Sequence, residues 1–372
     1  ESLATLESNS WTIGNQLVSG FYPNRIPNPD LKWEKTGQFD IGFDLGLFNN
    51  RLRLTADYYY KKTTDLLYNV AIPSASGYDS MLKNIGSVQN KGYELSIESD
   101  NLSGAFSWTT AFNISFNRNK VLELGGETYK DVGTYDDHLK TSDIRRLIVG
   151  QPIGVFYGYR FDGIFQNEAE CAQQTSSPSP IGVGLRRYKD LNGDGKIDAT
   201  NDREILGDAN PKFFGGMTNT FAYRGFELNV FLQYSYGNKI FNYNAMELES
   251  PTGGQNVYQD LVNRWTPTNP SNEYQKATTN RNNIVSDRFI EDGSFLKLKT
   301  VSLSYSFPKL NWKHIGGLRL YVTGQNLLTW TKYRGYDPEV SYRGASTLEA
   351  GEDFGGYPQA RTFMFGIKLD IK

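Results

Sequence analysis

The amino-acid sequence predicts an all-β protein whose strands form an antiparallel transmembrane β-barrel with long loops at one end. Three observations carry this prediction. Many long segments alternate apolar and polar residues, their apolar positions are rich in aromatics, and the connections between them differ greatly in length. Of 372 residues, 24 are Tyr and 22 are Phe, and both types favour strands. No run of about 18 apolar residues occurs, so no transmembrane helix is encoded.

The clearest hairpin is predicted at residues 38–60. In residues 38–47 every second residue is apolar, and polar residues or glycine fill the positions between them. After a turn at Asn49 and Asn50, residues 51–60 repeat this alternation. A period of two indicates a strand with one apolar and one polar face. The apolar positions are Phe39, Ile41, Phe43, Leu45, Leu47, Leu52, Leu54, Ala56, Tyr58 and Tyr60.

The alternation recurs along the chain and predicts roughly ten strands, many of about 9–12 residues, the length a tilted strand needs to cross a bilayer. A shift in the alternation between Leu298 and Val301 predicts a β-bulge. The further alternating segments are 93–98, 108–117, 226–236, 301–307, 318–323 and 363–371.

The connections fall into two classes. Short turns on one rim and long loops on the other are typical of outer-membrane barrels. The short connections are 49–50, 100–104 and 223–225, and the long polar ones are 125–145, 166–212, 242–290 and 334–360.

A soluble β-sandwich or β-solenoid would alternate in the same way. Strands of such folds are usually nearer five or six residues, and their apolar faces are rich in Val and Ile. Here aromatics cluster near strand ends, as at 58–60, Tyr234, Tyr236 and Trp330. Aromatic girdles at a membrane interface have this pattern, so the barrel is favoured.

Composition narrows the function. The chain has 39 Lys and Arg against 41 Asp and Glu, a formal net charge of −2, which argues against nucleic acid as a partner bound through bulk charge. Cys171 is the only cysteine, so no disulfide forms within the chain. The two histidines, His138 and His314, are too few for a multi-histidine metal centre.

Four separated blocks are more specific than alternation: residues 28–67 with NPDLKWEKTGQFDIGFDLGLFNN, 84–99 with NIGSVQNKGYELSIES, 190–242 with DLNGDGKIDATNDREILGDANPKFFGG, and 295–340 with FLKLKTVSLSYSFP and LRLYVTGQNLLTWTKYRGYDPEV. In this order and spacing they resemble the SusC/RagA family of TonB-dependent outer-membrane transporters of Bacteroidota. The resemblance runs from about residue 28 to the end of the sequence.

The resemblance implies an outer-membrane barrel of 22 strands, of which this chain would supply the C-terminal ten or so. Residues 1–30 would be a loop or strand entering the region, and 31–372 the barrel portion with the long loop 166–212. The plug domain is absent from this sequence. The expected partners are a SusD-like surface lipoprotein, TonB through the missing N-terminal region, the remainder of the same barrel, and outer-membrane lipid or lipopolysaccharide.

The function implied by the resemblance is TonB-dependent import of a nutrient, an oligosaccharide or a peptide. An alternative is a SusC-like barrel that serves as an assembly subunit of a larger outer-membrane complex. An enzyme is not expected, because no catalytic motif is found. Glu94 and Glu98 could mimic a glycosidase pair, but a solvated lumen face explains them better. Loop aromatics such as Tyr243, Tyr258, Tyr274 and Trp265 could stack on sugars or anchor the loops.

One motif carries metal chemistry. Residues 190–198 read DLNGDGKID, a calcium-loop pattern with oxygen ligands at positions 1, 3 and 5 and glycine at position 6. The predicted Ca²⁺ would be structural and would fix a long loop. The alternative is an Asx- and Gly-rich turn without metal. The predicted ligands are Asp190, Asn192, Asp194, the carbonyl of Lys196, Asp198 and Asp202, with Asn201 standing at position 12, where an EF-hand has Glu.

Overall fold

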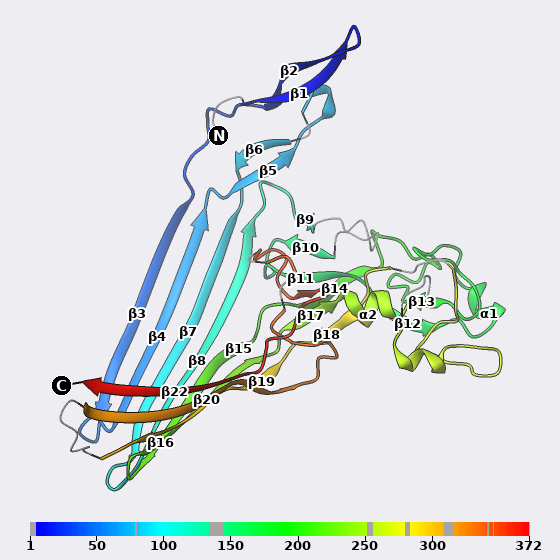
Figure 1. Ribbon diagram of the computed structural model, residues 1–372. Helices are drawn as coiled ribbons and strands as arrows, with labels where there is room; N and C mark the ends of the chain where they lie inside the picture. Colours follow the sequence, from blue (N-terminus) through cyan, green and yellow to red (C-terminus); the bar gives the residue numbers. More distant parts are fainter. Residues whose placement is uncertain are drawn as a thin grey trace.

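A computed structural model describes residues 5–78, 80–133, 144–250, 256–279, 283–308, 315–340, 342–344 and 346–371. Both histidines lie outside these ranges. A nine-stranded sheet dominates the described residues, and every neighbouring pair in it is antiparallel (Figure 1). In sheet order the strands are β22 (Thr362–Ile371), β20 (Ile315–Thr331), β19 (Phe295–Ser306), β16 (Phe226–Tyr236), β15 (Phe213–Tyr223), β8 (Phe106–Glu123), β7 (Ser87–Leu102), β4 (Leu52–Thr64) and β3 (Lys35–Leu47).

The strand register keeps the apolar residues on one face of this sheet. Residues that are directly paired across neighbouring strands form a row. The side chains of one row point to one face of the sheet, and those of the next row point to the other face. One row is apolar throughout: Leu45, Leu54, Ile97, Phe112, Met217, Leu232, Leu298 and Leu328. The neighbouring row carries polar residues and one glycine: Asp44, Thr55, Ser96, Asn113, Gly216, Gln233, Lys297 and Thr329.

The apolar face is exposed. Phe43 is 58% exposed, Phe365 is 82% exposed and Ile367 is 69% exposed. An apolar surface that spans nine strands far exceeds the patches that soluble monomers leave uncovered. This face therefore needs an apolar environment outside the chain.

The predicted tight turns and the bulge are confirmed. Residues 48–50 turn with positive φ between β3 and β4, and Arg224 and Gly225, also at positive φ, connect β15 to β16. Positive φ at both central residues suits the strand twist of a two-residue hairpin. The register shifts between Leu298 and Thr300 in both pairings of β19.

The long connections contain short strands and helices of their own. Residues 5–25 form a separate hairpin, and residues 67–84 form another. The remaining segments build three small sheets at the end of the large sheet opposite the tight turns (Figure 1). Their strands are β9 (Tyr129–Val132), β10 (Arg145–Ile148), β11 (Val155–Tyr159) and β14 (Arg203–Asp208); β12 (Phe161–Ile164) and β13 (Arg186–Tyr188); and β17 (Lys239–Asn242), β18 (Ile290–Asp292) and β21 (Glu352–Asp353).

Helices are short in the resolved ranges, and none is long and apolar enough to span a membrane. The two hairpins consist of β1 (Thr5–Ile13) with β2 (Gln16–Arg25) and β5 (Leu67–Ala71) with β6 (Ser80–Asn84). The helices are α1 (Glu168–Cys171), α2 (Tyr243–Leu248) and the 3-10 turns η1 (Ser74–Ser76), η2 (Gln259–Asn263) and η3 (Asp287–Phe289).

The main buried core lies in these connections and not in the large sheet. We call the described residues of 124–212, 237–294 and 332–361 the loop body. All three segments contribute to its core, the third through partly buried Phe354. The fully buried members are Ile144, Phe156, Phe241, Tyr243, Ala245, Met246 and Phe289.

A buried ion pair joins the first and third segments of the loop body. The Nε of Arg145 lies 2.9 Å from Oε1 of Glu352, and the two side chains are 1% and 2% exposed. Burial raises the pKa of the Glu352 carboxyl, although Arg145 opposes this effect. Glu352 also belongs to β21, which pairs in parallel with β17. The pair therefore links loops that leave the sheet between different strands.

We expect Arg145→Met to loosen the loop body, because it leaves the buried Glu352 carboxylate with only the longer 3.7 Å contact to Arg343, and breaking a buried pair costs up to about 3–5 kcal/mol. Amide hydrogen exchange should accelerate at residues 239–242 and 352–353. The matched control is Arg53→Met, since Arg53 pairs with Glu98 at an exposed site, where such pairs contribute about 0–1 kcal/mol. Equal acceleration in both variants would contradict the assignment.

Candidate functional site

The polar face of the large sheet is one part of the candidate site. Asp57 lies directly across from Glu94, and Nη2 of Arg53 lies 2.8 Å from Oε2 of Glu98. Glu94 and Glu98 thus belong to a wall of mixed charge, as the lumen interpretation expects. A wall of this kind suits the passage of hydrated solutes.

The third segment of the loop body is fixed to this polar face by Lys297. Lys297 is a buried residue of β19, and its Nζ donates to Oδ1 of Asp337 at 2.6 Å and to Oε2 of Glu339. Burial alone would raise the pKa of the Asp337 carboxyl, but the bonds that include Lys297 hold its pKa below the ordinary value. The segment that contains Asp337 and Glu339 is therefore held against the polar face.

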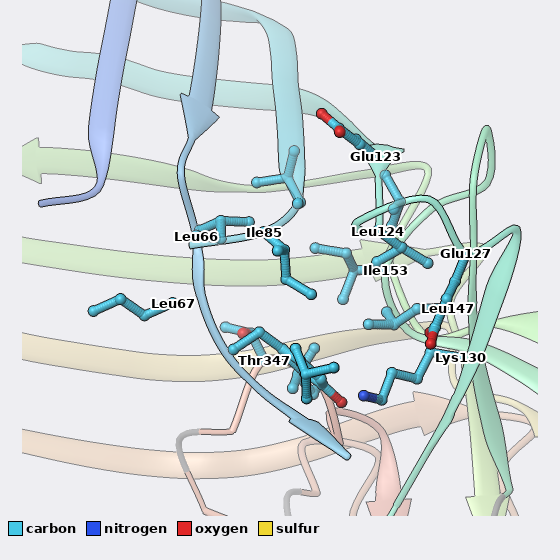
Figure 2. Close-up of a pocket in the computed structure, with 16 residues that line it drawn as sticks. Leu66, Leu67, Ile85, Glu123, Leu124, Glu127, Lys130, Leu147, Ile153 and Thr347 are labelled. Atoms are coloured by element: carbon cyan, nitrogen blue, oxygen red, sulfur yellow. The ribbon is translucent and has the colours of Figure 1, made fainter. Parts of the chain in front are cut away.

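A pocket of about 290 Å³ lies between the loop body and the end of the large sheet opposite the tight turns. Figure 2 shows Leu66 and Ile85 from the base of the β5–β6 hairpin facing Leu124, Leu147 and Ile153. These side chains come from separate segments, so no local sequence pattern could have indicated the pocket. Its lining suits an apolar group of modest size.

Charged groups stand beside the apolar lining of this pocket. Glu123, Glu127 and Lys130 contribute to its wall. The Nζ of Lys130 lies 3.8 Å from the centre of the Tyr68 ring, a cation–π geometry. The pocket thus combines apolar contact with charges of both signs.

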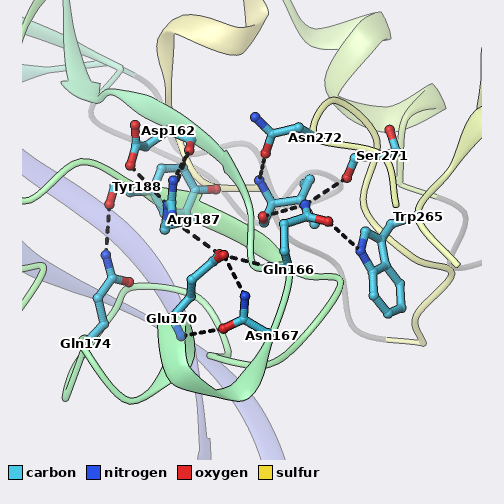
Figure 3. Close-up of polar contacts among 11 residues, drawn as sticks. Asp162, Gln166, Asn167, Glu170, Gln174, Arg187, Tyr188, Trp265, Ser271 and Asn272 are labelled. Carbon is cyan, nitrogen blue, oxygen red and sulfur yellow. Dashed lines mark hydrogen bonds and ion pairs between the residues drawn. The ribbon is translucent and has the colours of Figure 1, made fainter. Parts of the chain in front are cut away.

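A polar network holds the outer part of the loop body together (Figure 3). Oε2 of Glu170 accepts from the backbone amide of Gln166 at 2.9 Å and from Nη1 of Arg187 at 3.3 Å. The side chain of Gln166 accepts from Nε1 of Trp265 at 3.1 Å and donates to the Ser271 carbonyl at 3.1 Å. The first and second segments are joined here through side-chain hydrogen bonds.

Four of the loop aromatics take part in this network or in the core. Tyr243 is 2% exposed and Tyr274 is 9% exposed, while Trp265 is bonded to Gln166. Tyr258 packs against the core as a partly buried residue. These four aromatics anchor the loop body.

The calcium motif folds into a tight loop around its first carboxylate. The two oxygens of Asp190 accept from the amides of Gly193 at 2.6 Å and Gly195 at 2.7 Å. Both glycines have φ of 77°, where L side chains are strained. Asn192 accepts from the amide of Asp194 at 3.2 Å. The side chains at positions 1, 3 and 5 thus face one turn.

Asp202 closes the loop, and Asn201 does not. Asp202 is 0% exposed, and its oxygens accept from the amides of Leu191 and Asp198, both at 2.8 Å. Asn201 is exposed and donates to Oδ2 of Asp198 at 3.1 Å. Lys196 forms an isolated parallel β-bridge with Ser176, which ties the loop to the segment that follows α1.

The oxygen ligands of this loop are of the types that calcium binds, although the carboxylates would have to move closer together to contact one ion. In the described ranges no three His, Cys, Asp or Glu side chains already form a group that could hold a metal ion. Backbone hydrogen bonds, first from Gly195, hold the pKa of Asp190 below its ordinary value, and bonds from Asn201 and Thr200 do the same for Asp198. Ionised carboxylates with an amide and a carbonyl are the hard oxygen donors that Ca²⁺ prefers.

Comparisons with known proteins agree on one family. Residues 4–168 match the family model described as TonB dependent receptor-like, beta-barrel. TonB-dependent receptor P3 of Formosa agariphila is 40% identical over 378 residues, which cover 99% of this chain and 37% of that protein. TonB-dependent receptor SusC of Bacteroides thetaiotaomicron is 29% identical over 375 residues, which cover 98% of this chain and 34% of that protein.

Among solved structures, the RagAB peptide transporter matches with a TM-score of 0.80 and 26% sequence identity. The match covers 99% of this chain and 38% of that one. The chain therefore spans somewhat more than a third of the length of the proteins it matches.

Proposed function

This chain is part of the β-barrel of a TonB-dependent receptor of the SusC/RagA type, and we propose that the full-length protein actively imports a nutrient across the outer membrane. The observation that carries this proposal is the pair of neighbouring rows, one apolar and one polar, that cross the large sheet. In a barrel wall the apolar face contacts lipid and the polar face lines a lumen.

The sheet needs further strands to serve as such a wall. Within the residues described, β3 and β22 are each paired on one side only. An open edge inside a bilayer would leave backbone N–H and C=O groups without partners, which lipid does not tolerate. The remainder of the same barrel would close these edges.

The partners and the cargo follow from the same proposal. A SusD-like surface lipoprotein would cover the end that bears the loop body, and TonB would act on a part of the protein outside these 372 residues. The cargo would be an oligosaccharide or a peptide. The anchoring of the loop at 332–361 by Lys297 supports a lumen with controlled access.

Cysteine labelling of the full-length protein in membranes tests the wall. Gln233→Cys, on the polar face, should react with a water-soluble maleimide. Leu232→Cys, one residue away on the apolar face, should resist that reagent because lipid surrounds it. A label introduced at residue 232 before reconstitution should be quenched by lipid nitroxides. The wall assignment fails if the two positions react equally.

Uptake by the source bacterium tests the activity. Deleting the full-length gene should abolish uptake of one class of oligosaccharide or peptide, and deleting TonB should have the same effect, because import requires energy transmitted by TonB. Complementation with the intact gene is the control. If uptake is unchanged in both strains and the protein copurifies with other envelope proteins, the assembly role is the better description.

We further propose that the loop at 190–202 binds one structural Ca²⁺ through Asp190, Asn192, Asp194, the Lys196 carbonyl, Asp198 and Asp202. The ion would offset repulsion among the carboxylates and reduce the conformational freedom of the loop. Support comes from the buried Asp202, whose contacts bring the end of the motif back to its start.

We expect Ca²⁺ to slow hydrogen exchange at residues 191–203 of the wild-type protein relative to EGTA, and Asp194→Asn to remove most of this protection. Calorimetry should show saturable binding that the variant weakens at least about tenfold, since one charged ligand is lost. Glu168→Gln is the control, because it removes an exposed carboxylate of the same loop body. Identical exchange with Ca²⁺ and EGTA in the wild type would refute the site.

A further inference from the structure

Three tyrosines of the large sheet extend across a glycine on the neighbouring strand. A Cβ atom at any of these glycines would overlap the far end of the tyrosine ring, so only glycine leaves room for the ring there. We call each such tyrosine and glycine a crossing pair. In the register the crossing pairs are Tyr59 with Gly92, Tyr234 with Gly215, and Tyr321 with Gly366.

In two crossing pairs the tyrosine hydroxyl reaches the strand beyond the glycine. The hydroxyl of Tyr59, on β4, donates across β7 to Oδ1 of Asn117 on β8 at 2.9 Å. The hydroxyl of Tyr234, on β16, donates across β15 to the carbonyl of Asn113 on β8 at 2.8 Å. Each of these side chains therefore links three neighbouring strands, and the glycine of the middle strand makes the link possible.

The third crossing pair lies at an edge of the sheet. Among the strands that the structure describes, β22 is paired with β20 alone. The far end of the Tyr321 ring lies over Gly366, as in the other two pairs. Tyr321 is 41% exposed, and within the described ranges its hydroxyl forms no hydrogen bond. By the same geometry, this hydroxyl points to a strand that would pair with the free side of β22.

A cation on the same face of β22 lacks a counterion among the described residues. Lys368 is two residues from Gly366, so the two share a face, and Lys368 is exposed. It is directly paired with Arg319, and like charges in this arrangement repel. Arg319 already donates to Glu227 at 2.5 Å and to Ser304 at 2.7 Å. An acidic side chain on the free side of Lys368 would offset the repulsion.

Hydrophobic alternation alone does not fix how the free side of β22 pairs. A slip of one residue would exchange the faces, but a slip of two would leave every apolar side chain on the apolar face. The register must therefore be selected by residues that occur once along the strand. In β22 these include the only glycine, Gly366, and the only cation, Lys368.

We propose that Tyr321, Gly366 and Lys368 select the register in which the barrel closes. Tyr321 crosses Gly366 and donates to an oxygen-bearing side chain, as Tyr59 does to Asn117, and Lys368 pairs with an acidic residue. Both partners belong to the barrel strand that pairs with the free side of β22. This inference rests on the proposed function, because that strand lies in the remainder of the same barrel.

The proposal specifies the partner strand. Every pair in the large sheet is antiparallel, and an antiparallel partner runs against the numbering of β22. The acidic residue opposite Lys368 should therefore precede the hydrogen-bond acceptor opposite Gly366 by two residues. Both side chains should lie on the polar face, with apolar residues at the alternate positions.

Site-specific photo-crosslinking in the full-length protein in membranes tests the contact. Replacement of Tyr321 by p-benzoylphenylalanine should give a crosslink to a strand outside these 372 residues, two positions after an acidic residue, as mapped by mass spectrometry. The same replacement at Tyr59 is the positive control, because its hydroxyl contacts β8. Crosslinks from residue 321 only to non-barrel segments, or only within these 372 residues, would overturn the proposal.

Unfolding kinetics in urea test the role of the crossing. Tyr321→Phe and Gly366→Ala should each raise the unfolding rate of the full-length barrel at least about fivefold, because each removes the same hydrogen bond across the closure. The double variant should unfold no faster than Gly366→Ala. Gly37→Ala is the matched control, since Gly37 lies on the other edge strand and a Cβ there meets nothing within 4 Å. Equal rates for the Gly366 and Gly37 variants would contradict the role.

A charge exchange tests Lys368. Lys368→Glu should lower the yield of folded barrel, and replacing the acidic residue that precedes the crosslinked position by lysine should restore it. Absence of this rescue would refute the assigned ion pair. If Leu232→Cys and Gln233→Cys react equally with maleimide, the proposed function and this inference fall together. The crosslinking result decides the proposal even where a variant at Gly366 does not fold, because it retains that glycine.

Discussion

The structure depends on a strand register that keeps the apolar side chains of all nine strands on the same face of the sheet. A slip of one residue in any pairing would exchange the two faces of a strand and place polar side chains in the apolar row. The bulge in β19 shows how this is avoided. Leu298 and Val301 are an odd number of residues apart, yet both belong to the apolar face, opposite Leu232 and Val230. The extra residue absorbs the difference, and β20 compensates at Asn326, whose φ is positive.

The loop body follows a different principle, because it must hold segments that leave the sheet at separate places. Its apolar core is small, and buried ion pairs also connect its segments. Glu249 lies 2.6 Å from Arg288 and 3.7 Å from Arg186, with all three side chains at most 8% exposed. Such pairs contribute little to stability compared with apolar packing, but breaking one leaves an uncompensated charge. They therefore favour a single arrangement of the loops.

The sequence predicted the wall better than the loop body, and the reason is the range of the interactions. Alternation, tight turns and the bulge at Leu298 are local signals, so the strands and their faces could be derived. The count of about ten strands compares with nine found in the large sheet. The ligand role of Asp202 stays a prediction, although its oxygens accept from the amides of Leu191 and Asp198 at the two ends of the motif. Strands such as β12 and β13 are too short to show a period, and the pocket at Leu66 and Leu147 joins distant segments.

Wall and loop body also differ in what surrounds them, and this decides how a substitution acts. In the wall, Phe43 and Ile367 remain exposed within the chain, so their contribution depends on an external apolar medium. In the loop body, Phe156 and Phe241 are fully buried by the chain itself. Truncating Phe156 or Phe241 creates a cavity, whereas truncating Phe43 or Ile367 changes only the contact with the external medium. The loop body therefore buries its apolar side chains within the chain, whereas the wall depends on an apolar medium outside it.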